Sequence, residues 1–259
     1  SMADIYIDDA FGVVHRKHAS IHRVAKMLPN AMGFLMGKEI NVITSAMNNP
    51  DRPFVAILGG AKVSDKIAVI KNLLTKADTI LIGGAMAFTF LKAEGYNVGT
   101  SIVDDEKLEI AKNTLDEAKA LGKTILLPVD VVCTEVYSPS ARGTAYSVDK
   151  IPENMMGLDI GPETIKLFSK VIKEAHTVIW NGPVGVFEFD NFADGTKKIA
   201  KALTKVNGTT IVGGGDTAAA IHKFGYEDDI THISTGGGAS LKLLEGADLP
   251  GLDVLDDKE

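Results

Sequence analysis

The sequence predicts an α/β fold: a three-layer, Rossmann-like domain in which helices cover both faces of a parallel, six-stranded β-sheet. Two observations carry this prediction. From Phe54 onward, short apolar runs alternate strictly with helical segments, and such runs between helices are typical of strands buried on both faces of a parallel sheet. Almost every apolar run also ends in glycine, as turns from strand to helix often do. A chain of 259 residues can form one large α/β domain, alone or with an appendage.

Residues 1–48 precede this alternation and follow a different pattern. Residues 5–7 predict a short strand, which cannot stand alone. A long helix is predicted to follow, broken near Pro29 and continuing to about residue 48, where a turn-forming Asn-Pro-rich segment ends it. A helix of this length is a plausible connector between two bodies.

The elements of the main domain follow in order. Six apolar runs predict strands at 54–58, 79–82, 124–127, 177–180, 210–212 and 230–233. Seven segments between and after them predict helices at 63–76, 86–93, 105–121, 162–174, 192–205, 217–224 and 239–245. Only residues 129–152 break the rhythm, and they predict a small β-hairpin excursion.

Composition excludes several classes of function. The chain has 34 acidic and 27 basic residues and a net charge of −7, which argues against binding to nucleic acid or to anionic membranes. A phosphorylated substrate would have to be held by a local cluster of positive groups. The single cysteine, Cys133, excludes an internal disulfide, so a reducing cytosol fits. Since no apolar run reaches about 18 residues, we expect neither a membrane span nor a signal peptide.

The most informative turn follows the predicted strand at 210–212. Three glycines, 213–215, lead into Asp216-Thr217 and an alanine-rich helix. Glycines let the backbone approach an anion closely, and the helix N-terminus adds exposed N–H groups and a partial positive charge. A carboxylate in this place is useful if a cation joins it to the anion, so Asp216 suggests Mg²⁺ between protein and phosphates. The alternative is that Asp216 only caps the helix.

Further glycine turns fall at the carboxyl ends of other predicted strands, where open parallel sheets bind ligands. They are Gly59-Gly60, Gly83-Gly84, Gly182 with Gly185, and Gly236-Gly237-Gly238. One such turn is weak evidence, but five at one edge predict a binding cleft. The last turn opens a helix with bare N–H groups, which predicts a second anion site, although its glycines could also serve only as a hinge.

Charged residues beside these turns have a functional and a structural interpretation. Lys62 and Lys66 are four residues apart, which places them on one flank of the first turn of the predicted helix. Cations are unfavourable at a helix N-terminus, so the pair indicates an anionic partner, whereas ordinary surface lysines are the alternative. Glu188, on the loop after the strand at 177–180, could accept hydrogen bonds from ribose hydroxyls or could simply be solvated.

Two other ligands are disfavoured. The turn at 213–218 satisfies the G-x-G-x-x-A pattern of dinucleotide-binding proteins, but it comes late in the chain, and no acidic residue for a ribose follows about twenty residues later. We therefore discount NAD. The six histidines are scattered and have no cysteine partners, so zinc is not expected.

At this point the chain is identified by its motifs as similar to the phosphoglycerate kinase family, with the resemblance extending over residues 3–259. The matching segments are GGAKVSDK (59–66), GGAMAFTFLK (83–92), LPVDVV (127–132), MMGLDIGP (155–162), WNGPVGVFE (180–188), VGGGDTAAAI (212–221) and STGGGASLKLLEG (234–246). The resemblance implies a cytoplasmic phosphotransferase of glycolysis with a carboxyl group as acceptor. It would move a phosphoryl group between 1,3-bisphosphoglycerate and ADP, giving 3-phosphoglycerate and ATP, with Mg²⁺.

The resemblance also implies a role for each matching residue. Lys66 would lie nearest the nucleotide's phosphates and Lys62 near the migrating group. Gly83, Gly84 and Gly157 would form the walls of the adenine pocket, Asn181 and Pro183 would line the nucleotide cleft, and Glu188 would bind the ribose. Gly214, Gly215, Asp216 and Thr217 would form the loop that holds the phosphates and the metal ion. Gly237 and Gly238 would stabilise the phosphoryl group in transit. Such a site fits a loose transition state, which needs positioned positive charge and amides more than a protein nucleophile.

The chain matches only part of the family pattern, and the resemblance predicts how its residues divide among the domains of that family. Family members carry a full N-terminal domain whose arginines and histidines hold phosphoglycerate, and only residues 1–23 resemble its end, with Arg16 as the one matched substrate arginine. By the resemblance, 24–48 is the interdomain connector helix, 49–245 the nucleotide-binding domain and 246–259 a tail that returns to the absent domain. We expect residues 3–16 and 249–259 to pack poorly or against a neighbouring chain.

Three hypotheses for the chain stay open. The first is the nucleotide-binding half of a usually monomeric kinase, which binds MgADP or MgATP with little or no turnover by itself. The second is a stand-alone nucleotide-binding module with a regulatory or interaction role. The third is a dinucleotide-dependent oxidoreductase, which would bind NAD(H) in preference to ADP.

Overall fold

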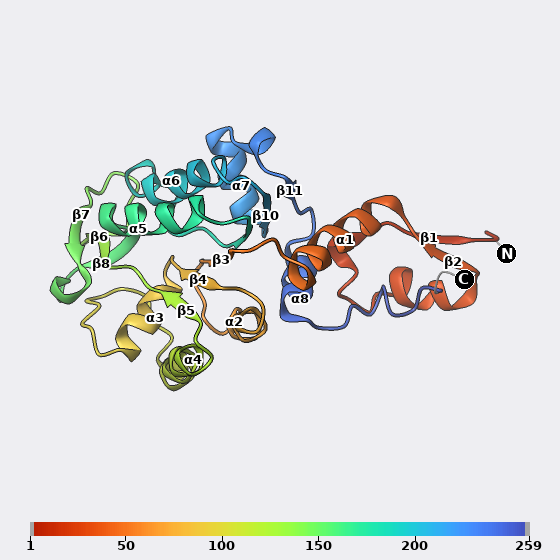
Figure 1. The fold of residues 1–259 in the computed structure, drawn as a ribbon, viewed down its shortest axis with the longest axis horizontal. Coiled ribbons are helices and arrows are strands. Elements are labelled where there is room, and N and C mark those ends of the chain that lie inside the picture. Colours follow the sequence, from red (N-terminus) through yellow and green to blue (C-terminus); the bar gives the residue numbers. More distant parts are fainter. Residues whose placement is uncertain (1–2, 257–259) are drawn as a thin grey trace.

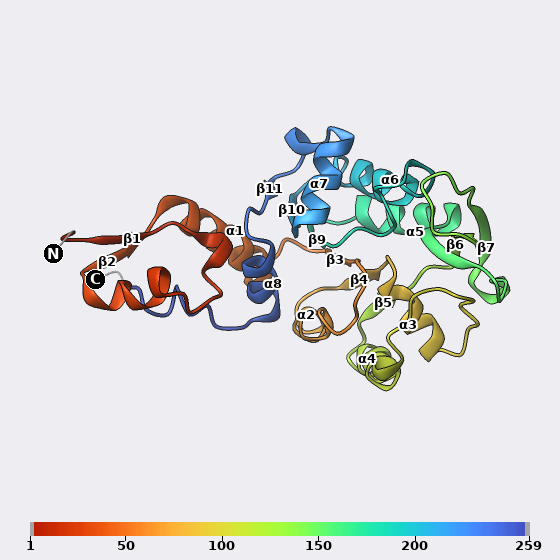
Figure 2. The same cartoon turned by 180° about the vertical axis from the view of Figure 1, so that it is seen from behind.

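The protein is described by a computed structural model that covers residues 3–256. A large body contains the main sheet and its helices, and residues 3–33 extend away from it (Figure 1). Helices α1 (Phe34–Asn48) and α8 (Gly237–Glu245) lie between the two parts. The view from behind shows the same arrangement, with β1 and β2 at the end of the molecule that is remote from the main sheet (Figure 2). No helix within residues 3–256 has the length and apolar character needed to cross a membrane.

The main sheet has six parallel strands in the order β11-β10-β9-β3-β4-β5. Their bounds are β3 Phe54–Leu58, β4 Thr79–Ile82, β5 Thr124–Leu126, β9 Thr177–Asn181, β10 Thr209–Gly213 and β11 His232–Ile233. Strands β4 and β5 follow β3 toward one edge of the sheet, and β10 and β11 follow β9 toward the other edge. This is the doubly wound arrangement, whose switch point lies between β3 and β9. The predicted parallel sheet is confirmed.

Helices cover both faces of this sheet, as predicted. Besides α1 and α8 they are α2 Ile67–Leu74, α3 Met86–Ala93, α4 Leu108–Ala120, α5 Pro162–Lys173, α6 Asp194–Leu203 and α7 Gly215–Phe224. Alternate residues of β3 belong to two separate cores, because successive side chains of a strand point to opposite faces. Phe54 packs in the core with α1 to α4 and α8, and Val55 packs in the core with α5, α6 and α7.

The hairpin predicted within 129–152 is present and belongs to a three-stranded antiparallel sheet. Strand β6 (Asp130–Thr134) pairs with β7 (Thr144–Ser147) on one side and with β8 (Met156–Ile160) on the other. Strand β8 was not predicted, because its sequence contains Gly157 and Asp159, which disfavour a strand. It is nevertheless well buried, since it lies between β6 and the main body.

Two predicted helices begin four or more residues later than predicted. The helix predicted over 24–48 begins only at Phe34, because Leu28 before Pro29 is extended (φ −136°, ψ 154°), as residues before proline tend to be. The helix predicted from residue 63 begins at Ile67, so the segment with Lys62 and Lys66 is a turn that leads into α2 rather than its first helical turn.

Short helical turns complete the secondary structure. They are a π-helical turn at Ala19–Arg23 and 3-10 turns at Phe11–Val13, Ala25–Met27, Asp105–Lys107, Val148–Lys150, Asp190–Phe192 and Glu227–Asp229.

Residues 3–33 and the tail from Leu249 to Asp256 together form the smaller part of the molecule. Strand β1 (Tyr6–Asp8) pairs in parallel with β2 (Asn30–Met32), which gives the predicted strand the partner it needs. The tail contacts this part, since the Gly251 N–H donates to the Val14 carbonyl at 2.8 Å and Val14 is fully buried. The expected poor packing is therefore wrong for Leu249 and Gly251 of the tail and for Phe11 and Val14, which are buried. It is right for Ile5, Ile7 and Val13, whose side chains are exposed. Residues 257–259 lie outside the described residues.

Candidate functional site

The glycine turns at the switch point are locked together through their backbones. The Gly59 N–H donates to the Asn181 carbonyl at 3.0 Å, and the Gly60 N–H donates to the Pro183 carbonyl at 2.9 Å. Gly182 has a φ of +99°, and a Cβ there would lie 2.2 Å from the Gly59 carbonyl oxygen. Only glycine fits this conformation and this approach. The turns after β3 and β9 therefore form one continuous floor at the carboxyl edge of the sheet.

A cavity of about 180 Å³ opens above this floor. It is lined by Gly59, Gly60, Ala61, Lys62, Asp65, Lys66, Asn181, Gly182, Pro183, Gly214, Gly215, Asp216 and Thr217. The cavity thus brings together both predicted lysines, the predicted glycine loop and the predicted acid.

Lys66 is the main positive group of this cavity. Its ammonium donates to the carbonyl of Asn181 at 3.3 Å and to the side-chain oxygen of the same residue. Burial lowers the pKa of Lys66 to about 8, although the carboxylates of Asp65 and Asp216 act in the opposite direction. Asn181 is buried, and its side-chain nitrogen has no partner among the described residues. Lys62, by contrast, is exposed and forms no hydrogen bond or ion pair within residues 3–256.

Two helix N-termini converge beside the cavity. Gly214 (φ +89°) precedes α7, and Asp216 lies in the first turn of that helix with an exposed side chain. Gly237, the first residue of α8, is close enough that an added Cβ would lie 3.6 Å from the Gly215 nitrogen. Helix N-termini carry partial positive charge and unpaired N–H groups, so this arrangement favours an anion. The Thr217 hydroxyl is already used, since it accepts from the Gly182 N–H at 2.7 Å.

A second, mainly apolar cavity of about 290 Å³ adjoins the first and shares part of its lining, including Gly60, Pro183 and Asp216. Gly84, Phe88, Val184, Gly157, Tyr137 and Glu188 also line it. An added Cβ at Gly157 would lie 2.1 Å from the Phe88 ring, so a side chain at this position would have to displace that ring. Gly83 lines neither cavity. An added Cβ there would lie 2.7 Å from the Val184 side chain, which makes Gly83 a packing residue.

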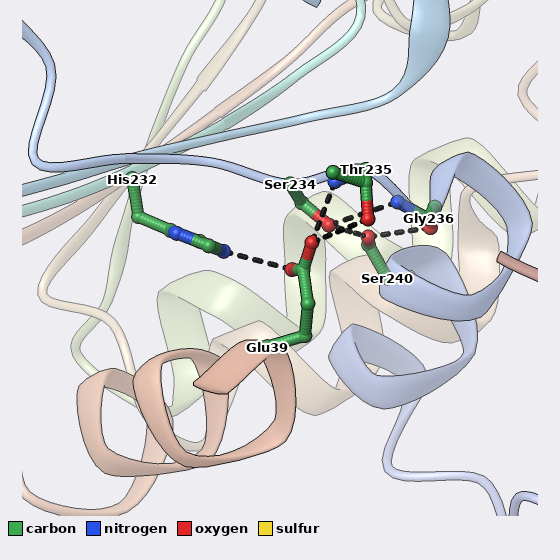
Figure 3. Close-up of polar contacts among 6 residues, drawn as sticks. All are labelled: Glu39, His232, Ser234, Thr235, Gly236 and Ser240. Carbon is green, nitrogen blue, oxygen red and sulfur yellow. Dashed lines mark hydrogen bonds and ion pairs between the residues drawn. The ribbon is translucent and has the colours of Figure 1, made fainter. Parts of the chain in front are cut away.

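The loop before α8 is held by a buried polar cluster that sequence reasoning missed (Figure 3). Glu39 of α1 is fully buried, and its carboxylate lies 2.7 Å from His232 Nε2. It also accepts hydrogen bonds at 2.7 Å from the backbone N–H and from the hydroxyl of Thr235. Burial raises the pKa of Glu39, but these hydrogen bonds outweigh it and lower the pKa to about 2. A charged residue between the buried positions Met36 and Ile43 of one helix was the available signal.

The N-terminal part contributes a histidine to the same region. His15 lies against the start of α8, because an added Cβ at Gly238 would be 2.8 Å from His15 Nε2. Its Nδ1 is buried without a hydrogen-bond partner among the described residues, and burial, followed by the charge of Arg16, lowers its pKa. The predicted substrate residue Arg16 is exposed, donates to His15 at 3.3 Å and lines neither cavity. Sequence reasoning had assigned nothing to His15.

A doubly wound sheet with glycine turns at its switch point, and helix N-termini that meet over a polar cavity, defines the class of nucleotide-binding α/β proteins. Within that class the family is clear. The phosphoglycerate kinase family model matches residues 1–247, so the chain belongs to the phosphoglycerate kinase family.

Curated relatives and solved structures agree with this assignment. A phosphoglycerate kinase of Thermosipho africanus is 54% identical over 262 residues, which cover 100% of this chain and 65% of that protein. A relative from Arabidopsis thaliana, phosphoglycerate kinase 3, cytosolic, is 52% identical and is matched over 65% of its length. The solved phosphoglycerate kinase of Coxiella burnetii superposes with a TM-score of 0.93 at 40% identity, over 97% of this chain and 66% of that one. The chain thus spans about 65% of the length of these relatives.

Proposed function

We propose that this chain is the nucleotide-binding part of a phosphoglycerate kinase and that it binds ADP and ATP across the two joined cavities. The observation that carries the proposal is the shared wall of the cavities. One cavity offers Lys66 and the N-terminus of α7 to phosphates, the other offers apolar walls to a base, and Asp216 lines both. A nucleotide has the same two ends joined in one molecule. Residues 49–245 would form this domain, with α1 as its connector to the rest of the protein.

Within this proposal each group has a chemical task. The base would lie between Gly84, Gly157 and Val184, and Glu188 would accept hydrogen bonds from the ribose. Lys66 and the α7 N-terminus would hold the ADP phosphates, while Lys62 and the α8 N-terminus at Gly237 and Gly238 would stabilise the phosphoryl group in transit. Because such a transition state spreads negative charge over three oxygens, positioned cations and N–H groups are what it requires.

The residues present also fit Mg²⁺. Asp216 forms no hydrogen bond or ion pair with other described residues, so both of its oxygens are free for a cation. The described residues contain no cluster of three or more metal-ligating side chains, and Mg²⁺ commonly takes only one or two carboxylates together with phosphate oxygens and water. When bound there, Mg²⁺ would neutralise charge on the phosphates.

We further propose that transfer from 1,3-bisphosphoglycerate to ADP needs residues of the relatives that this chain does not match, so that the chain alone turns over little. Arg16 is its only candidate for the phosphoglycerate side, and it lines neither cavity. Orientation and transition-state charge are each commonly worth orders of magnitude in rate. The names of relatives such as the Arabidopsis thaliana protein support a cytosolic location.

Replacing Asp216 with alanine tests the proposal directly. We expect MgADP affinity to fall about tenfold or more, because the cation would lose its protein ligand, while metal-free ADP should bind the variant as it binds the wild type. Calorimetric titration with and without Mg²⁺ measures both values, and Asp228→Ala, an exposed acid on another turn, is the matched control. Preferential binding of NADH by the wild type would contradict the proposal.

Replacing Gly157 with alanine separates the two cavities. The new methyl group would force the Phe88 ring, which lines the base cavity, to move. Overpacking typically costs about 1–3 kcal/mol, so ADP affinity should fall about fivefold or more. Inorganic tripolyphosphate, which has no base, should bind this variant and the wild type equally. Equal losses for both ligands would show that Gly157 does not shape a base pocket.

A further inference from the structure

Glu188 lies on a segment whose shape depends on its neighbours. Between the end of β9 at Asn181 and the start of α6 at Asp194, the only regular structure is the 3-10 turn Asp190–Phe192. Contacts from other elements must therefore hold the backbone around Glu188, whose exposed side chain lines the base cavity.

One neighbour is the last turn of α7. The Lys223 ammonium donates to the carbonyl of Phe187 at 2.9 Å and to a carboxylate oxygen of Asp190 at 2.9 Å. These two acceptors flank Glu188 in sequence. The Phe187 side chain is buried against Ala220 of the same helix, so apolar contact and hydrogen bonds both join the segment to α7.

Another neighbour is the loop between β6 and β7. The ring of Tyr137 lies 4.9 Å from the ring of Phe189, centroid to centroid, in a tilted arrangement that favours aromatic attraction. The side-chain amide of Asn191 donates to the carbonyls of Pro139 and Ala141 at 3.3 and 2.9 Å. Strand β8 also holds the segment, because the Val186 N–H donates to the Leu158 carbonyl at 2.8 Å. Of these attachments, the one to α7 leads to the phosphate cavity.

We propose that Lys223 is a positioning residue for Glu188 and that, through it, α7 couples the phosphate end of the nucleotide site to the ribose end. Helix α7 carries Asp216 in its first turn and Lys223 in its last, so one rigid element fixes both ends. The inference rests on the proposed nucleotide site. Of the two contacts of Lys223, the hydrogen bond to the Phe187 carbonyl is the one that positions the segment. The ion pair with Asp190 contributes little, because Asp190 is 91% exposed.

The test compares Lys223→Met with the wild type, using MgADP and its 2′,3′-dideoxy analogue as calorimetric ligands. Methionine keeps the apolar stem and removes the donor. We expect MgADP affinity to fall about fivefold to tenfold, which is less than the full loss of a charge-assisted hydrogen bond, because Lys223 acts on the ligand only through the position of Glu188. The dideoxy analogue, which offers Glu188 no hydroxyl, should bind both proteins within about twofold. Glu188→Gln combined with Lys223→Met should lose no more than Glu188→Gln alone.

Two further variants guard against a merely structural effect. Lys223→Arg, which can reach the same acceptors, should recover most of the MgADP affinity. Lys201→Met, in the last turn of α6 and exposed, should behave as the wild type. Equal weakening of both ligands by Lys223→Met, or none, would overturn the positioning role. Failure of the wild type to bind MgADP would instead overturn the proposed function, and this inference with it.

Discussion

Replacing Lys66 with methionine is expected to abolish measurable nucleotide binding and at the same time to stabilise the protein at neutral pH. The ammonium is the principal cation of the phosphate cavity, so its loss should weaken MgADP binding at least about a hundredfold, as expected for charge-assisted bonds to phosphate. Its burial also costs free energy, which shows as a pKa lowered from 10.5 to about 8. By linkage, that difference corresponds to about 3 kcal/mol at most.

The pH dependence gives this prediction a definite sign. Between pH 8 and 10.5 the unfolded chain keeps the proton on Lys66 and the folded protein releases it, so this lysine makes the wild type more stable as pH rises through that range. The methionine variant should lack the rise. Urea unfolding at pH 7 and pH 10 measures the difference. Lys62→Met, an exposed lysine in the same turn, should change stability by less than about 0.5 kcal/mol. A Lys66→Met protein that is less stable at pH 7 would contradict the explanation.

Replacing Glu39 with glutamine is expected to have the largest effect on stability. The side chain is fully buried and satisfies His232 together with the N–H and hydroxyl of Thr235. The side-chain NH₂ of glutamine would face a donor of His232 or Thr235 and would leave that buried group without an acceptor. The free energy of unfolding should therefore fall by about 3–5 kcal/mol. The loop before Gly237 would lose its attachment to α1, so MgADP binding should weaken as well.

Acid should remove most of this difference. The pKa of Glu39 is lowered from 4.5 to about 2, so its contribution is complete above about pH 4.5 and is lost as the pH falls toward 2. The gap in unfolding free energy between the wild type and Glu39→Gln should therefore narrow between pH 5 and pH 2 in urea titrations. Glu174→Gln, an exposed glutamate, is the control. A gap that stays constant over this range would show that the charge of Glu39 is not what stabilises the loop.

The main sheet could be predicted from the sequence because its central strands are apolar on both faces and most of its strands lead into glycine turns. Strand β8 could not, since Gly157 and Asp159 owe their places to tertiary contacts: Gly157 to the Phe88 ring, and Asp159 to the backbone N–H of Gly195, which donates to it at 2.7 Å. The helix expected over 24–48 failed in its first part for a similar reason. Residues 30–32 pair with β1, which lies far away in sequence.

The site was predictable where its chemistry is local. The turns at Gly59 and Gly214 show their character within a few residues, and both line the polar cavity as expected. Glu39 and His232 are separated by 193 positions, so no short pattern could connect them. Thr217 lines the cavity as predicted, yet its hydroxyl binds a backbone amide, a use that spacing alone does not distinguish from ligand binding.

The interlocked backbone of the turns after β3 and β9 has a consequence for affinity. Hydrogen bonds such as that from Gly59 to Asn181 fix the floor of the crevice when the domain folds. The conformational entropy of ordering these glycines, which is the largest of any residue type, is then lost during folding and not on encounter with a ligand. The crevice is therefore preorganised for any ligand that binds there, and slow ordering steps would have to come from elements elsewhere.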